Sequence, residues 1–155
     1  MRSPDLKSLK GPGNLAAGPF TNILIPSEPG EARRVQEEIE RHLRACRATD
    51  HDVFSIRLAL VEALVNAIKQ GNQMDRSKKV TVVSFVEAER FEVHVTDEGS
   101  GFDPGDVPDP TALENLERPC GRGLMLMRHY MSEVAFNERG NCVTMSKMLP
   151  GTGKI

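Results

Sequence analysis

The sequence predicts an α+β two-layer sandwich, in which a mixed or largely antiparallel sheet is covered on one face by helices. Two observations lead to this fold class. A short strand is followed by two helical segments, one from about Glu31 and one from Thr49. Two pairs of strands then follow, each pair joined by a short turn, with a long loop and a third helix between the pairs.

The first half of the chain gives the early elements. Residues 1–19 are rich in Pro and Gly and poor in large apolar groups, which predicts a flexible tail. A strand over 20–25 is ended by Pro26. Apolar residues then recur at helical spacing from Ala32 to Cys46, with charges between them, which predicts an amphipathic helix.

The second helix is predicted to lie centrally, because it is apolar almost all round. Thr49 and Asp50 are its cap candidates, and Gly71 follows its end as a plausible C′ glycine. In the strand over 91–96, Phe91, Val93 and Val95 alternate with polar residues and share one face. The remaining predicted elements are a strand over 79–86, a loop over 98–120, a helix over 123–132, and strands over 134–138 and 142–148. One domain therefore spans 20–149, with a C-terminal tail over 150–155.

Composition excludes several classes of function. A net charge of −2 gives no general attraction to nucleic acid or anionic lipid. The cysteines are three, far apart and without a CxxC pair, which argues against a disulfide scaffold and a zinc site. No uninterrupted apolar run approaches the ~18 residues of a membrane span, and no signal peptide is evident. We therefore expect a cytoplasmic protein.

Four polar residues of the second helix project within a narrow arc: Ser55, Glu62, Asn66 and Lys69. Glu62 and Asn66 lie one turn apart on the same face. One interpretation is a plain solvent-exposed stripe. The other is a carboxylate and an amide facing a cleft, where their oxygens suit a hard cation such as Mg²⁺.

Two glycine-containing segments add to this pattern. In Asp97-Glu98-Gly99-Ser100-Gly101, an Asp at a strand end can accept a hydrogen bond from the exocyclic amine of a ring, and the glycines allow close approach. Gly121-Arg122-Gly123-Leu124 opens a helix, whose free N–H groups suit a phosphate. The alternatives are an ordinary turn and an ordinary helix start.

Together, in this order and spacing, the three segments resemble the GHKL ATPases. Glu62-Ala-Leu-Val-Asn66-Ala is similar to the N box, Asp97-x-Gly99-x-Gly101 to the first glycine box, and Gly121-x-Gly123-Leu124 to the second. Within that superfamily the chain most resembles the anti-sigma factor serine/threonine kinases, from about Ile23 to Lys147. The resemblance implies a Bergerat-type ATP-binding fold.

The resemblance also implies a role for each matching residue. Asn66 would coordinate Mg²⁺, and Glu62 would be the general base. Asp97 would bind the adenine amino group, with Gly101 close to the base. Gly121 and Gly123 would present N–H groups to the phosphates of ATP, and Thr144 stands where the family often has a threonine near the adenine. The loop over 102–120 would be the ATP lid. Our own candidates for γ-phosphate contacts are Lys69, Arg118 and Arg122.

One position departs from the family pattern. The family usually has a histidine shortly after the Asn, whereas this chain has Asn66-Ala-Ile-Lys-Gln70-Gly. Glutamine has no titratable proton, so any role of that position in proton transfer is in doubt.

Two functions therefore stay open. One is a kinase that phosphorylates an anti-anti-sigma (STAS) protein, sequesters a sigma factor and forms homodimers, as the family fold often does. The other is an ATP-gated protein-binding regulator with little or no kinase activity. A sensor histidine kinase fragment is a weaker third reading, because no room exists before Phe20 for a dimerising helical hairpin.

Overall fold

The computed structural model describes residues 20–99 and 119–150 of the chain. Their elements follow one another in an order close to the predicted one. They are β1 (Phe20–Pro26), η1 (Pro29–Glu31), α3 (Ala32–Ala45), α4 (Asp50–Val65), η2 (Asn66–Gly71), β2 (Lys79–Glu87), β3 (Arg90–Thr96), α5 (Pro119–Tyr130), β4 (Glu133–Phe136) and β5 (Cys142–Met148).

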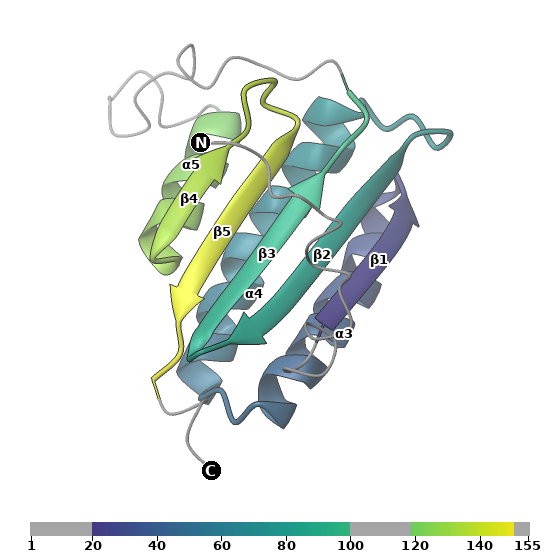
Figure 1. Ribbon diagram of the computed structural model, residues 1–155. Helices are drawn as coiled ribbons and strands as arrows, with labels where there is room; N and C mark the ends of the chain where they lie inside the picture. The colour runs from purple at the N-terminus through teal and green to yellow at the C-terminus, as the bar shows by residue number, and fades with distance from the viewer. Residues whose placement is uncertain (1–19, 100–118, 151–155) are drawn as a thin grey trace.

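The strands form one five-stranded sheet in the order β1-β2-β3-β5-β4 (Figure 1). Every neighbouring pair is antiparallel, so the sheet is not mixed. The β2–β3 hairpin confirms the predicted one, and its tight turn places Ala88 and Glu89 at positive φ. The second predicted hairpin, β4–β5, is also present.

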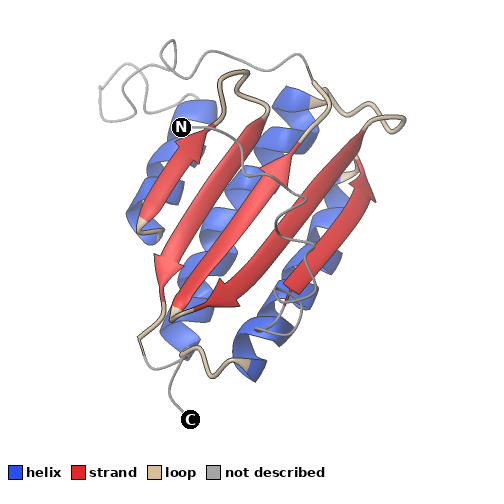
Figure 2. Ribbon diagram, viewed as in Figure 1, coloured by secondary structure: helices blue, strands red, loops and turns tan. Residues whose placement is uncertain are grey.

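The helices α3, α4 and α5 lie together on one face of the sheet, which makes the two-layer sandwich that the sequence predicts (Figure 2). The core lies between the two layers. On the sheet side, Phe91, Val93 and Val95 are buried together, as their alternation predicts. The described residues include no helix that is both long and apolar enough to span a membrane.

Helix α4 is the central helix, as its composition predicts. It begins at the predicted cap, where the amide of Asp52 donates to the Thr49 hydroxyl at 3.1 Å. Residues on several sides of it are buried, from Val53 to Leu64. Because it is covered by the sheet and by neighbouring helices, its polar residues are positioned on a rigid element.

The end of this helix differs from the predicted one. The α-helical pattern stops at Val65, and η2 continues as a π-helix to Gly71. Across this wider turn the amide of Asn72 donates to the carbonyl of Ala67 at 2.8 Å. Such turns are rare and occur mainly at functional sites. Gly71 is not a left-handed C′ glycine, because Gly140 alone among the described glycines has a positive φ.

Helix α5 also begins earlier than predicted, at Pro119 rather than Gly123. Gly121 therefore lies in its first turn, where backbone N–H groups lack a partner within the helix. Gly123 lies in its second turn, where the amide falls within the regular helical pattern. Position 123 therefore needs a glycine because it has no side chain, and not because its N–H group is free to bind a ligand.

Candidate functional site

Helices α4 and α5 bring the first and third predicted segments into direct contact. Glu62 lies on α4 and Asn66 is the first residue of η2, and both side chains border Gly123 of α5. A Cβ on Gly123 would lie 3.1 Å from Oε2 of Glu62 and 3.1 Å from Nδ2 of Asn66. Only glycine therefore leaves this pair of oxygen-bearing groups unobstructed from the α5 side.

The second predicted segment lies at the end of β3 and meets the end of η2. A Cβ on Gly71 would come within 3.0 Å of the carboxyl group of Asp97. A Cβ on Gly99 would also come within 3.0 Å of the carbonyl of Gly71. The two glycines are needed for the close approach of two backbones, and this approach seats Asp97 beside the helix that carries Glu62 and Asn66.

Asp97 is a buried carboxylate with few direct partners. The residue is 9% exposed, and Oδ1 accepts a hydrogen bond from the amide of Gly99 at 2.8 Å. Burial raises the pKa of Asp97, and the Gly99 amide and the charges of Arg139 and Lys78 oppose that rise only partly. A buried acceptor of this kind is costly for the fold, which is typical of a binding group.

Three residues near Asp97 were not among the predicted site residues. Asn141 holds Asp97 through its carbonyl, which accepts from the Asp97 amide at 2.9 Å, and through Nδ2, which donates to the Asp97 carbonyl at 3.1 Å. Arg139 reaches the Gly99 carbonyl at 3.4 Å. Asn72 accepts from the Glu98 amide at 2.8 Å. The sequence shows these residues only as parts of turns, so no local signal marks them.

The other predicted residues are distributed more widely. Leu124 is buried on α5, and Lys69 is exposed on η2. Ser55, which shares the arc of Glu62, is buried, so that arc is not a plain solvent-exposed stripe. Gly121 and Arg122 lie in the first turn of α5. Gly101 and Arg118 lie outside the described residues, as does almost all of the predicted lid.

Thr144 is not brought to this site. It pairs with His94 across β3 and β5, on the sheet face opposite the one that carries Phe91 and Val93. Its hydroxyl lies 2.8 Å from Nδ1 of His94, and Nε2 of His94 lies 2.7 Å from Glu92. The threonine therefore belongs to a polar network on the far side of the sheet from the helices.

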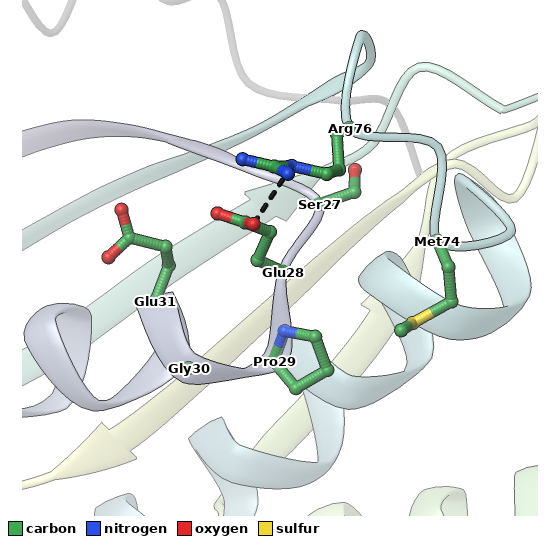
Figure 3. Close-up of a pocket in the computed structure, with 7 residues that line it drawn as sticks. All are labelled: Ser27, Glu28, Pro29, Gly30, Glu31, Met74 and Arg76. Atoms are coloured by element: carbon green, nitrogen blue, oxygen red, sulfur yellow. Dashed lines mark ion pairs between the residues drawn. The ribbon is translucent and has the colours of Figure 1, made fainter.

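A separate surface hollow lies at the start of the helical layer (Figure 3). It measures about 510 Å³ and includes an ion pair between Arg76 and Glu28 at 2.8 Å. The lining residues are Ser27, Glu28, Pro29, Gly30, Glu31, Met74 and Arg76. None of the predicted site residues lines it, although Ser27 is linked through Asn72 to the loop that carries Asp97.

A cation at Glu62 and Asn66 would have few protein ligands. No group of three or more His, Cys, Asp or Glu side chains among the described residues is arranged to hold a metal. Mg²⁺ suits such a sparse site, because it keeps several waters and is commonly bound by one or two protein oxygens together with substrate phosphates. The amide oxygen of Asn66, in the space that Gly123 leaves open, fits this requirement.

Comparison with known proteins agrees with this arrangement. A family model described as the histidine kinase-like ATPase domain matches residues 25–147, which include Glu62, Asn66, Asp97 and Gly123. The chain is 27% identical over 139 residues to the serine-protein kinase RsbW of Bacillus subtilis (strain 168), covering 85% of this chain and 87% of the relative. It is 32% identical over 107 residues to RsbW of Bacillus licheniformis, covering 63% of this chain and 66% of that protein.

A further relative and a solved structure extend the comparison. The chain is 26% identical over 88 residues to the serine/threonine-protein kinase BtrW of Bordetella bronchiseptica, covering 56% of this chain and 62% of the relative. It also resembles a crystal structure of the RsbU and RsbW domains of Rv1364c from Mycobacterium tuberculosis, with a TM-score of 0.61 and 18% identity. That likeness covers 84% of this chain but only 32% of the mycobacterial chain, and it concerns the fold.

Proposed function

We propose, because the chain belongs to the histidine kinase-like ATPase domain family, that it binds ATP with Mg²⁺ and phosphorylates another protein on serine or threonine. The observation that carries this proposal is the meeting of Glu62 and Asn66 with Gly123. A carboxylate and an amide are thereby gathered against the second turn of α5, with the buried Asp97 at the end of β3. These are the groups that a nucleotide, a cation and a hydroxyl would each need.

Asp97 would select the base. Its carboxylate can only accept hydrogen bonds when ionised, and the exocyclic amine of adenine is a donor. Gly71 and Gly99 hold the carboxylate in place without covering it with their own side chains. Asn141 fixes the backbone of Asp97 on both sides, so the acceptor is preorganised before any ligand arrives.

Asn66 and Glu62 would serve the phosphate end of the nucleotide. The oxygen of Asn66 would hold the cation, and when bound that cation would neutralise phosphate charge. Glu62, one turn away, would receive the proton of the acceptor hydroxyl. The acceptor oxygen then bonds to the γ-phosphorus, the bond from that phosphorus to the bridging oxygen breaks, and ADP leaves. Positioning and charge neutralisation are the main requirements of this reaction.

The partners are proposed from the relatives. Three of the similar proteins above carry the name of serine or serine/threonine kinases. By analogy with the anti-sigma factor kinases, we infer that the acceptor is an anti-anti-sigma (STAS) protein and that the same chain sequesters a sigma factor in the cytoplasm. A homodimer would be the assembly that performs both tasks.

A second candidate is a regulator that binds ATP but transfers little or no phosphate. The observation in its favour is Gln70, which is exposed on η2 and has no titratable proton. In this case nucleotide binding alone would change the affinity for a partner protein. Glu62 and Asn66 are retained under both proposals, so they do not distinguish them.

Calorimetric titration with a non-hydrolysable ATP analogue, with and without Mg²⁺, tests the shared part of both proposals. We expect binding that depends on Mg²⁺. The purified chain is then incubated with radiolabelled ATP and a STAS-domain protein from the same genome. Label transferred to that protein supports the kinase, whereas tight binding without transfer supports the ATP-gated regulator. Absence of any nucleotide binding would contradict both.

A further inference from the structure

Asn72 is a fully buried polar residue that connects three separate segments of the chain. Its side chain is 0% exposed, and it follows directly after Gly71 at the end of η2. Nδ2 donates to the hydroxyl of Ser27 at 2.8 Å and to the carbonyl of Lys79 at 3.0 Å. Oδ1 accepts from the amide of Glu98 at 2.8 Å. Both amide hydrogens and the amide oxygen therefore have partners.

The orientation of this amide is fixed by the chemistry of its partners. A backbone N–H can only donate and a backbone carbonyl can only accept, so Oδ1 must face Glu98 and Nδ2 must face Lys79. The Ser27 hydroxyl then accepts from Asn72 and donates onward to the Lys78 carbonyl at 2.7 Å. A flipped amide would place like groups against each other at two points.

Asn72 and Gly71 hold consecutive parts of the same loop. Gly71 lies against the carboxylate of Asp97, and the next residue, Asn72, accepts from the amide of the residue after Asp97. Two neighbours on one segment therefore engage two neighbours on the other. The peptide that follows Asp97 is held on its N–H side by Asn72 and on its carbonyl side by Asn141. The rotation of this peptide helps to decide where the carboxylate points.

We propose that Asn72 is the positioning residue that sets base selection, because its bond to the Glu98 amide holds the Asp97 carboxylate at the angle at which it accepts from the adenine amine. This role rests on the proposed nucleotide function. Asn72 is fully buried and has no exposed atom with which to contact a base, so it would act through Asp97. Its effect is exerted through the direction of one carboxylate, so it concerns the choice between bases more than binding of the phosphates.

Ser27 supplies the matched control. It shares the Asn72 network but lies on the opposite side, where it lines the surface hollow (Figure 3). Ser27→Ala removes one partner of Asn72 and leaves the bond to the Glu98 amide in place. Both Ser27→Ala and Asn72→Ala delete buried hydrogen bonds and will lower thermal stability. Only Asn72→Ala removes the hydrogen bond to the Glu98 amide.

The test compares the binding of MgADP and MgIDP by calorimetry. In IDP a carbonyl group stands in place of the adenine amine, and a carbonyl cannot donate a hydrogen bond to the Asp97 carboxylate. We expect wild type and Ser27→Ala to prefer MgADP by about tenfold or more, the value of one well-made hydrogen bond to a charged group. In Asn72→Ala the preference should fall to about threefold or less. Asn72→Ser, which keeps a small polar group, serves if the alanine variant does not fold.

Amide hydrogen exchange at Glu98 supplies a readout that needs no nucleotide. We expect faster exchange in Asn72→Ala and unchanged exchange in Ser27→Ala. Unchanged exchange in both variants would overturn the positioning role, whatever the binding data show. Faster exchange with an unaltered MgADP preference would overturn the link to base selection. If wild type binds neither nucleotide, the proposed function fails and base selection with it, and the exchange data still decide whether Asn72 holds the loop.

Discussion

Gly71 lies so close to Asp97 that a Cβ on the glycine would come within 3.0 Å of all three atoms of the carboxyl group. The φ angle of Gly71 is not in the left-handed region, so backbone conformation does not require a glycine there. The requirement is space. The end of η2 and the end of β3 can approach each other only where one residue has no side chain, and this approach seats the buried carboxylate.

Gly71→Ala should therefore displace Asp97 and weaken nucleotide binding. The new Cβ would meet the carboxyl group of Asp97, and Asn141 holds the backbone of Asp97 at its amide and its carbonyl. We therefore also expect a loss of about 1–3 kcal/mol in the free energy of unfolding, as for other overpacked positions. Urea denaturation and MgADP titration measure the two effects. Gly30→Ala is the control, because a Cβ there meets nothing within 4 Å. Equal effects of the two substitutions would contradict this account.

Gly123→Ala should separate stability from function. Alanine favours a helix interior by about 1 kcal/mol over glycine, so α5 itself gains. The added Cβ, however, would lie 3.1 Å from Glu62 Oε2 and from Asn66 Nδ2, and both must shift by a few tenths of an ångström. We expect an unchanged or higher melting temperature together with weaker Mg²⁺-dependent nucleotide binding. A variant that binds as tightly as wild type would show that Gly123 does not border the cation site.

Local patterns explain why so much of the fold could be predicted. The alternation of Phe91, Val93 and Val95 and the Thr49 cap depend on neighbours in sequence, and the structure confirms both. The same reasoning could have placed Thr144 correctly. It stands between Val143 and Met145, which are buried, and a strand turns successive side chains to opposite faces. The prediction for Thr144 rested instead on the resemblance to the family, in which a threonine often lies near the adenine.

Other parts of the site had no local signal. The π-helical turn of η2 begins at Asn66 without a proline or glycine to mark it. Asn72 and Asn141 read as ordinary turn residues, and their partners lie in segments that only the folded chain brings near. The early start of α5 at Pro119 is different, because proline is favoured at the first position of a helix and was a local signal that the prediction did not use.

Glu62→Gln and Asn66→Ala should fail at different steps. Glutamine cannot take a proton, so Glu62→Gln should bind MgATP normally and lose phosphate transfer by about 10²–10⁴-fold, the usual contribution of a general base. Asn66→Ala removes the proposed cation ligand, so Mg²⁺-dependent binding should be lost. Calorimetry and a radiolabel transfer assay distinguish the two. If Asn66→Ala bound MgATP as tightly as wild type, the site assignment would be wrong.

Asp97→Asn should raise the free energy of unfolding and remove the preference for the adenine base. Burial raises the pKa of Asp97, which means that the folded state disfavours its charge at neutral pH. Asparagine removes that charge and can still accept from the Gly99 amide, so we expect the free energy of unfolding at pH 7 to rise by up to about 1 kcal/mol. The preference for MgADP over MgIDP should disappear, because the amide both donates and accepts. If Asp97→Asn were less stable than wild type, the charge of the Asp97 carboxylate would be stabilised by its surroundings, and this account would be wrong.

The network on the opposite face of the sheet should make stability depend on pH. Burial alone would lower the pKa of His94, but the interactions of its side chain with Cys142 and Glu92, together with the Glu92 charge, raise it overall. The hydrogen bond from His94 lowers the pKa of Glu92 despite burial, helped by the charges of His94 and Arg90. Both partners are therefore charged together over a range of mildly acidic pH, where the pair is strongest.

The direction of this dependence follows from linkage. The contribution of His94 is complete below its ordinary pKa of 6.5 and is lost as the pH rises through the raised value. That of Glu92 is complete above 4.5 and is lost as the pH falls through the lowered value. Against wild type, His94→Gln should therefore lose about 1 kcal/mol more at pH 5.5 than at pH 8.5, as measured by urea denaturation. His51→Gln, at an exposed position, is the control and should follow the wild-type curve; a constant deficit in His94→Gln would exclude a charged pair.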